Sequence, residues 1–392
     1  MNIRLFATLF LAVFSVTLGV GLVVPFLPVY AHELGATGLY IGFMFGVFSL
    51  SRTAFLPYFG KISDRKGRKP FITTGLLAYF LVSIAYVFSN SVELFILIRF
   101  FQGIASAMIF PVALAYIGDI ALERREGFIM GLFNLSLYGG LSVGPVIGGI
   151  VKDSFGIQIS FLSMGLFNFV GFLLCLILLP PRKQENPRSK TKPPLKYRTL
   201  VKDRNIGGLF VFRFAYTTCI GIVWAFLPLL ADSEFNLSSS LIGTLLMLGV
   251  LTTGLLQTPM GFLADRFNKR ILVAIGGLVA GGALFSFVRV HSIGGLFFAN
   301  ILFGIGGGIA IPSVMAMTVI LGRRTHSMGS IMGLLTAGHS LGMLLGPIMA
   351  GIMMDAFQLS TGFVVGTAVM ALGIIVSLVL TANFQTLAKD SA

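Results

Sequence analysis

Residues 60–69 read GKISDRKGRK, and residues 261–270 repeat the arrangement as GFLADRFNKR about 200 positions later. Each copy has a leading glycine, an adjacent Asp-Arg pair and two closing basic positions. Each copy also lies between two long apolar segments. A short charged connection between apolar helices, present twice at a fixed distance, predicts a membrane protein built from an internal duplication.

The composition agrees with a membrane location. Of the 392 residues only 11% are charged, whereas soluble domains carry about 25%. Hydrophobic residues make up 56%, phenylalanine alone occupies 38 positions, and the mean hydropathy is +0.94. These values exclude a soluble enzyme, a soluble nucleic-acid-binding protein and a disordered chain, because too few polar side chains remain to cover a water-exposed surface.

The apolar segments are long enough to cross a bilayer, which takes about 20 residues of helix. The N-terminal segment is too long for the apolar core of a signal peptide, so we expect it to be retained as the first helix. The fold class predicted is an all-α polytopic membrane protein. Its twelve predicted spans are residues 5–31, 38–60, 71–89, 93–118, 128–151, 158–180, 206–231, 240–263, 271–289, 294–320, 328–353 and 360–382.

The basic residues predict the orientation of these spans. With the N-terminus in the cytoplasm, 23 of the 28 Lys and Arg residues fall in cytoplasmic segments. Only Lys152 and Arg289 fall outside, and Arg52, Arg99 and Arg213 lie within spans. This bias predicts a multi-pass protein of the cell inner (plasma) membrane with both termini cytoplasmic. It also accounts for the net charge of +14 without a nucleic-acid partner.

The duplication predicts the domain organisation. GPVIGG at 144–149 returns as GPIMAG at 346–351, and Asp153 returns as Asp355. We therefore expect an N-terminal six-helix bundle at 1–180, a cytoplasmic linker at 181–205 and a C-terminal six-helix bundle at 206–392. Duplicated bundles of this kind hold substrate near the bilayer midplane, between the two repeats.

Three motifs have a physical interpretation. In the first, Gly60 would allow close helix approach and Gly67 a tight turn, while the basic residues hold the connection at the cytoplasmic face. In the second, Arg99-Phe-Phe-Gln102-Gly103, a charge within a span is costly and usually functional. The third has small-xxx-small spacing, which lets helices pack closely, and a proline that bends the helix; its residues are Gly140, Gly144, Pro145, Gly148 and Gly149.

With these motifs the chain resembles the major facilitator superfamily, and within it the twelve-helix drug:proton antiporter family. The resemblance implies alternating access, a charge latch from the first motif, proton coupling from Arg99 and an antiporter signature in the third motif. A purely topological basic connection is the alternative for the latch. The latch residues implied are Gly60, Asp64, Arg65, Gly67, Arg68, Asp119, Arg124, Asp265 and Arg266.

Polar residues within spans are the candidates for substrate binding. Asn134 and Tyr138 share a face of one helix, and Arg213, Tyr216 and Thr217 share a face of another. An ordinary interhelical hydrogen bond is the alternative for any single member. The full set is Arg52, Asn134, Tyr138, Arg213, Tyr216, Thr217, Trp224, Gln257, Asn300 and His339.

Proton coupling needs a group that titrates during the cycle. His339 is the best placed, because the unperturbed pKa of histidine is near neutrality. A neutral histidine that donates to a backbone carbonyl is the alternative. Glu33, with Arg99 as its candidate partner, is a further possibility. No span carries an Asp or Glu at mid-depth. Three arginines without such carboxylates favour anionic, zwitterionic or neutral amphipathic substrates over organic cations.

The function predicted is a secondary active transporter, not an enzyme, that exports a small amphipathic solute. The sequence has no P-loop, HExxH or GxSxG motif, and two isolated cysteines cannot form a metal site. We expect no cofactor, the proton gradient as energy source, lipid as surroundings, and a monomer. The alternatives are a transporter of an anionic metabolite or sugar, a lipid or lysolipid flippase, and, last, a non-transporting membrane sensor.

Overall fold

The computed structural model describes residues 3–120, 126–180, 202–325 and 327–384. Twelve helices in this part of the chain are long and apolar enough to cross a membrane, which confirms the predicted fold class. The first span comprises α1 (Ile3–Val23), η1 (Val24–Phe26) and α2 (Leu27–Glu33). The others are α3 (Gly38–Lys66), α4 (Lys69–Val87), α5 (Val92–Ile120), α6 (Glu126–Phe155), α7 (Ile157–Leu178), α9 (Arg204–Ser233), α10 (Ser239–Arg266), α11 (Lys269–Arg289), α12 (Ile293–Arg324), α13 (Met328–Ala356) and α14 (Thr361–Leu380).

Helices α3 and α10 extend further than the apolar pattern predicted. The sequence placed their ends at 60 and 263, whereas they end at Lys66 and Arg266. Hydropathy marks the segment that suits the hydrocarbon, but backbone hydrogen bonding continues into the charged turn beyond it. Gly67, with a φ of 88°, ends α3 as the predicted tight turn.

The chain divides into two compact units. The first comprises Met1–Pro187 with Ala231–Val250, and the second comprises Arg188–Leu230 with Leu251–Ala392. The first part of α10 thus belongs to the first unit and the rest to the second. The predicted linker at 181–205 stays a prediction, because residues 181–201 lie outside the described part of the chain.

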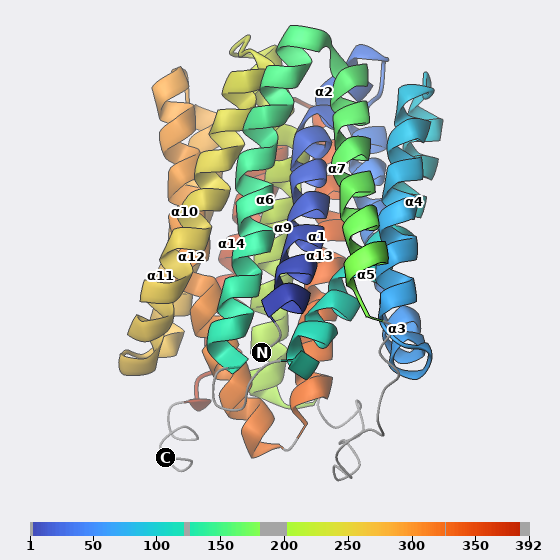
Figure 1. The fold of residues 1–392 in the computed structure, drawn as a ribbon. Coiled ribbons are helices and arrows are strands. Elements are labelled where there is room, and N and C mark those ends of the chain that lie inside the picture. Colours follow the sequence, from blue (N-terminus) through green and yellow to red (C-terminus); the bar gives the residue numbers. More distant parts are fainter. Residues whose placement is uncertain (1–2, 121–125, 181–201, 326, 385–392) are drawn as a thin grey trace. The chain divides into compact units, whose positions relative to one another are not determined.

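Within each unit the helices pack side by side (Figure 1). In the first unit α1 contacts α6 and α7, α3 runs along α5, and α4 contacts α5 and α7. The rings of Tyr86, Phe95 and Phe161 stack where α4, α5 and α7 meet, with centroids 5.1 and 5.5 Å from that of Tyr86. In the second unit α11 contacts α12 and α14.

The duplication is visible in two equivalent contacts. In the first unit Lys69 Nζ donates to the carbonyl of Leu176, 2.7 Å away, in the last turn of α7. In the second unit Arg270 Nη2 donates to the carbonyl of Leu378, 2.8 Å away, in the last turn of α14. Lys69 and Arg270 occupy the same position of the repeated charged motif. Each cation therefore caps the C-terminus of the last helix of its own repeat, where unpaired carbonyls favour positive charge.

Replacing Arg270 tests this cap. Arg270 also donates to Thr381 Oγ1 at 3.3 Å and to the carbonyl of Ala382 at 3.1 Å. We expect Arg270→Gln to lower the free energy of unfolding by about 1–3 kcal/mol, because charge-assisted hydrogen bonds to three acceptors are lost. Unfolding of the purified protein in detergent measures the loss. Arg289→Gln, at an exposed arginine, is the control; equal effects would contradict a capping role.

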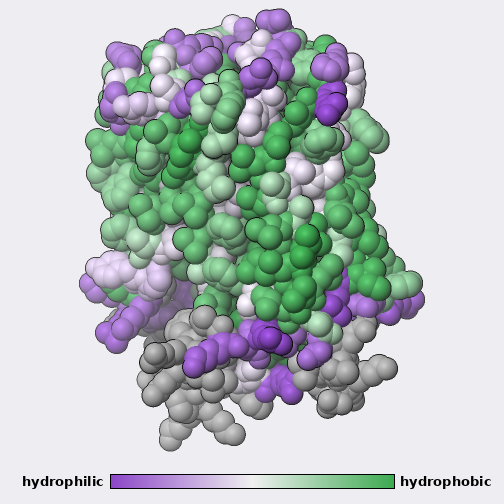
Figure 2. All heavy atoms as spheres, turned by 180° about the vertical axis from the view of Figure 1, so that it is seen from behind, coloured by the Kyte–Doolittle hydropathy of each residue, from purple (hydrophilic) through white to green (hydrophobic). Residues whose placement is uncertain are grey.

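The surface is apolar along the sides of the helices, with hydrophilic residues gathered at the ends (Figure 2). Leu81, Leu166, Leu278 and Leu372 are each more than half exposed. Such side chains suit contact with lipid and would be costly in water. The protein is therefore a multi-pass membrane protein; the particular membrane and the cytoplasmic placement of both termini stay predictions.

Candidate functional site

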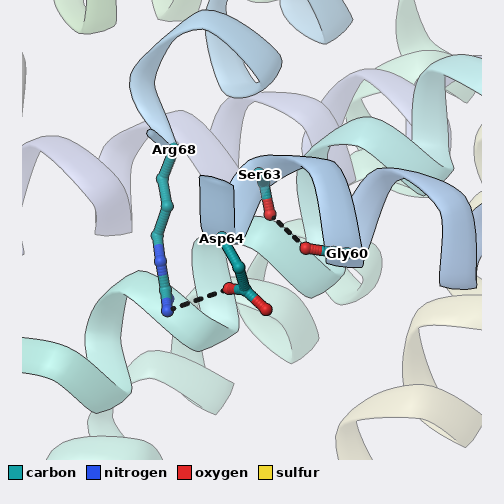
Figure 3. Close-up of polar contacts among 4 residues, drawn as sticks. All are labelled: Gly60, Ser63, Asp64 and Arg68. Carbon is teal, nitrogen blue, oxygen red and sulfur yellow. Dashed lines mark hydrogen bonds and ion pairs between the residues drawn. The ribbon is translucent and has the colours of Figure 1, made fainter. Parts of the chain in front are cut away.

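Residues of the first charged motif, 60–69, interact with one another (Figure 3). Arg68 Nη2 lies 3.6 Å from Asp64 Oδ1, and Ser63 Oγ donates to the carbonyl of Gly60 at 2.8 Å. The Arg68 side chain is only 10% exposed, whereas that of Asp64 is 58% exposed. Asp64 is thus held across the turn by its own motif, with its outer oxygen accessible to solvent.

Other parts of the predicted latch differ from expectation or stay untested. A Cβ atom added to Gly60 would meet no atom of the described residues within 4 Å, so among these residues the predicted close helix approach is not made at this position. Arg65 is exposed, as are Asp265 and Arg266, and the Arg266 guanidinium lies 4.1 Å over the Phe262 ring. The side chain of Asp119 and the whole of Arg124 lie outside the described residues, so the latch stays a prediction.

Arg99 is the centre of a buried polar network in the first unit. Its side chain is 3% exposed; Nε donates to the carbonyl of Met44 at 3.1 Å, and Nη1 donates to Gln102 Oε1 at 3.0 Å. The guanidinium also lies over the rings of Phe45 and Phe48, at 5.0 and 4.6 Å. This arrangement satisfies a cation with neutral acceptors and aromatic faces, which is one of the few ways to bury a charge in a membrane protein.

Glu33 takes no part in this network. It is exposed at the end of α2, and Arg99 is buried against α3 and α5. The predicted pairing of Glu33 with Arg99 is therefore wrong. The reason is that a backbone carbonyl of α3 and the amide oxygen of Gln102 on α5 itself reach the guanidinium, while Glu33 lies at the helix end.

Arg52 lies on α3 of the first unit and is half-buried. Its guanidinium lies 5.5 Å from the centroid of the Phe110 ring on α5. It forms no hydrogen bond or ion pair with any residue that the structure describes. Asn134 and Tyr138, on α6 of the same unit, differ in environment, since Asn134 is exposed and Tyr138 is half-buried.

In the second unit the structure brings Arg213 and His339 together. Arg213 Nη2 on α9 lies 3.3 Å from His339 Nδ1 on α13. A guanidinium can only donate, so a hydrogen bond at this contact requires Nδ1 as the acceptor, which only the neutral tautomer with its proton on Nε2 provides. A second proton on Nδ1 would remove the acceptor and break the contact.

Other candidates of the second unit surround α9. Thr217 is buried and its hydroxyl donates to the carbonyl of Arg213 at 2.7 Å, with the carbonyl of Gly338 on α13 at 3.5 Å. Tyr216 instead stacks on Phe303 of α12 at 5.9 Å. The predicted shared face of Arg213, Tyr216 and Thr217 is thus divided between two neighbours. Asn300 on α12 is 2% exposed.

Trp224 on α9 and Gln257 on α10 are half-buried. All these candidates belong to the second unit, whereas Arg52, Asn134 and Tyr138 belong to the first. The predicted common cavity therefore stays a prediction.

The glycine motif of α6 makes close helix contacts in the first unit. A Cβ atom at Gly140 would meet Thr17 and the carbonyl of Phe14, and one at Gly144 would lie 2.7 Å from the Gly21 Cα. Thr17 Oγ1 lies 3.1 Å from the carbonyl of Ser136 across the same interface. These glycines let α6 lie directly on the backbone of α1, as the small-xxx-small spacing predicted.

The same motif continues to the N-terminus of α10. A Cβ atom at Gly149 would lie 2.5 Å from the Ser239 carbonyl carbon. Asp153 accepts hydrogen bonds from the backbone amides of Ser239 and Ser240, at 2.9 and 2.8 Å, and from the Ser240 hydroxyl at 2.7 Å. The carboxylate thus caps the first turn of another helix, a role that sequence analysis missed because the partners are more than eighty residues apart.

Carboxylates on the described helices lie only in first or last turns. This holds for Glu33, Asp64, Glu93, Asp119, Glu126, Asp153, Asp232, Asp265 and Asp355. Arg52, Arg99 and Arg213 lie about two turns or more from the helix ends. The interior of the spans is therefore cationic, in agreement with the residue pattern.

Sequence analysis also missed Tyr79, Tyr86 and Ser106. They belong to no motif, yet Tyr79 and Tyr86 repeat at i, i+7 on α4, opposite Arg99, Gln102 and Ser106 at i, i+3, i+7 on α5. These two rows of polar residues could have indicated the cluster from the sequence. They can be recognised as one cluster only when it is known that α4 packs against α5.

The fold and the arginines within the spans define a class, a polytopic membrane protein made of repeated helical units. The pattern of the Major Facilitator Superfamily matches residues 9–232 and 209–390, so the chain belongs to that family. It is a secondary transporter and not an enzyme.

Similar proteins and solved structures agree with this family assignment. An uncharacterized MFS-type transporter of Methanocaldococcus jannaschii is 30% identical over 354 residues, covering 88% of this chain and 90% of the relative. Multidrug resistance protein 1 of Bacillus subtilis is 25% identical over 368 residues, covering 92% of each. The crystal structure of the nucleoside transporter NupG has a TM-score of 0.79 at 15% identity, with 96% of this chain and 99% of that chain covered, which shows the shared fold.

Proposed function

We propose that the protein exports a small amphipathic solute, anionic or neutral, by proton-coupled alternating access. The observation that carries the charge preference is the distribution of ionisable groups: arginines lie deep in the spans and carboxylates only at helix ends. Export is supported by the antiporter-type glycine motif of α6 and by the similarity to Multidrug resistance protein 1.

Coupling to protons is supported by the contact between Arg213 and His339. A proton on Nδ1 of His339 and the hydrogen bond from Arg213 exclude each other. Protonation would therefore release the Arg213 side chain, one of the residues that we propose to contact the solute. A pH gradient can drive transport through such a mutually exclusive pair, because the two states differ in how they bind the solute.

Proteoliposomes with an imposed pH gradient test the proposal. We expect gradient-dependent accumulation of fluorescein, an amphipathic anion, and at least tenfold less of the cation ethidium. Arg52→Ala and Arg213→Ala should each reduce fluorescein transport, because a positive charge within the span that attracts the anion is lost.

Two results would contradict the proposal. Unchanged fluorescein transport by both variants would exclude the anion preference. Accumulation that does not respond to the gradient would exclude proton coupling and indicate a uniporter.

A further inference from the structure

A polar cluster between α3, α4 and α5 of the first unit has no part in the proposed transport cycle beyond Arg52 and Arg99. Arg52 comes from α3. Tyr79 and Tyr86 come from α4, and Arg99, Gln102 and Ser106 come from α5. Tyr79 lies within electrostatic range of both arginines and beside Ser106.

At one end of the cluster the amide oxygen of Gln102 is fully hydrogen-bonded. Gln102 Oε1 accepts hydrogen bonds from Tyr86 at 3.1 Å and from Arg99 at 3.0 Å. Because two donors converge on this oxygen, the orientation of the carboxamide is determined. Its nitrogen, Nε2, then points away from both donors and has no hydrogen-bond partner, although Gln102 is 0% exposed.

At the other end of the cluster, polar groups keep hydrogen-bonding capacity that no described residue uses. The hydroxyls of Tyr79 and Ser106 are buried, in side chains that are 0% exposed; they interact with each other, and neither has a further hydrogen-bond partner among the described residues. Arg52, which is within electrostatic range of Tyr79, makes no ion pair or hydrogen bond within residues 3–120 and 126–180. The Gln102 amide nitrogen and the Tyr79–Ser106 pair are buried with unused hydrogen-bonding capacity, which is unusual, since buried polar groups are nearly always paired with protein or bound water.

The unused groups share one chemical property. The guanidinium of Arg52 and the amide nitrogen of Gln102 can only donate, and the pair of Tyr79 and Ser106 hydroxyls keeps one donor free when one of them donates to the other. A ligand that forms hydrogen bonds with all of these donors must offer acceptor atoms. A negative charge on the ligand would in addition pair with the positive guanidinium. A carboxylate has two oxygens and about four acceptor sites. The aromatic face of Phe110 beside Arg52 would suit an apolar body attached to that group.

We propose that Arg52, Tyr79, Ser106 and the Gln102 amide nitrogen form a binding site for the carboxylate of an amphipathic organic acid. The site rests on the proposed function, in which the protein transports an amphipathic solute, and it gives that solute a chemical class. It lies wholly within the first unit. Arg99 is a positioning residue here, because its bond to Oε1 aims the amide nitrogen of Gln102 at the ligand.

Titration calorimetry of the purified protein with benzoate tests the site, with neutral benzamide as the matched ligand. We expect saturable binding of benzoate, and at least tenfold weaker binding of benzamide. Arg52→Gln should weaken benzoate binding tenfold or more, whereas Arg289→Gln, at an exposed arginine, should not change it. Absence of saturable benzoate binding, or equal affinity for benzamide, would overturn the proposal.

Tyr79→Phe and Ser106→Ala separate a ligand site from a structural role. Each substitution removes one hydroxyl of a buried pair that has no further partner, so the melting temperature without ligand should change little. Benzoate affinity should nevertheless fall about threefold to tenfold, because a hydrogen bond to an ionised group is lost. Tyr58→Phe, at an exposed tyrosine, is the control. Lower melting temperatures with unchanged benzoate affinity would mean that the hydroxyls serve the fold or bound water alone.

The same samples distinguish the site from the proposed function. If the expected benzoate pattern appears but proteoliposomes show no gradient-driven transport, the proposed function fails and the carboxylate site stands. If fluorescein is transported but benzoate binding ignores Arg52, Tyr79 and Ser106, the site fails and the proposed function stands.

Discussion

Gly148→Ala is expected to destabilise the protein severely, by about 3 kcal/mol or more. A Cβ atom at Gly148 would lie 2.6 Å from Leu22 Cα and 2.7 Å from its carbonyl carbon. These are backbone atoms, so no side-chain rotation can relieve the overlap, and α6 must move away from α1. Overpacking in cores costs about 1–3 kcal/mol even where side chains can adjust. The separation would also disturb the contacts of Gly140 and Gly144 on the same interface.

Gly139→Ala is the matched control for this prediction. Its Cβ atom would meet only the ring of Phe14, at 3.6 Å, an ordinary contact. Since alanine favours helix by about 1 kcal/mol over glycine, this variant should be neutral or slightly stabilised. The thermal stability of both variants in detergent, and their yield from membranes, decide the matter. Equal behaviour would show that close packing of α6 on α1 does not limit stability.

His339→Gln is expected to abolish gradient-driven accumulation, reducing it at least tenfold, while passive exchange of the solute continues. Glutamine can still accept a hydrogen bond from Arg213, so the contact between α9 and α13 survives. It cannot take up a proton at physiological pH, so the contact no longer responds to the gradient. Transport would then follow the solute gradient alone.

The measurement compares accumulation with and without a pH gradient in proteoliposomes. His291→Gln is the matched control, because His291 is exposed between α11 and α12. Gradient dependence that survives in His339→Gln would assign proton coupling to another group. Loss of exchange as well as accumulation would mean that the histidine serves substrate binding rather than coupling.

The spans illustrate what could be predicted from residues alone. Their number and order follow from hydropathy, because the need to bury apolar side chains and pair every backbone group in lipid leaves few choices. The ends of α3 and α10 could not be predicted, since the helix continues into charged residues at the membrane boundary. Gly67 was predicted from its position in the motif, whereas Gly60 was assigned a close contact that it does not make among the described residues.

The candidate site, too, could be predicted only in part from the sequence. Arg52, Arg99, Arg213 and His339 could be selected by residue type, because polar groups inside a span are rare and costly. Their partners could not. Met44 offers a backbone carbonyl to Arg99, and Asp153 caps α10 from a distant position, so neither contact has a sequence signal.

The sequence by itself determined that this is a duplicated, twelve-span carrier with a cationic interior, because composition, loop charges and repeated motifs are local properties of the chain. Only the tertiary structure decided which polar groups meet. It joined Arg213 to His339, turned Arg99 to Gln102 rather than to Glu33, and left the Gln102 amide nitrogen without a hydrogen-bond partner. The physical reason is that hydrogen bonds between helices depend on the rotation and register of packed neighbours, which no single helix specifies.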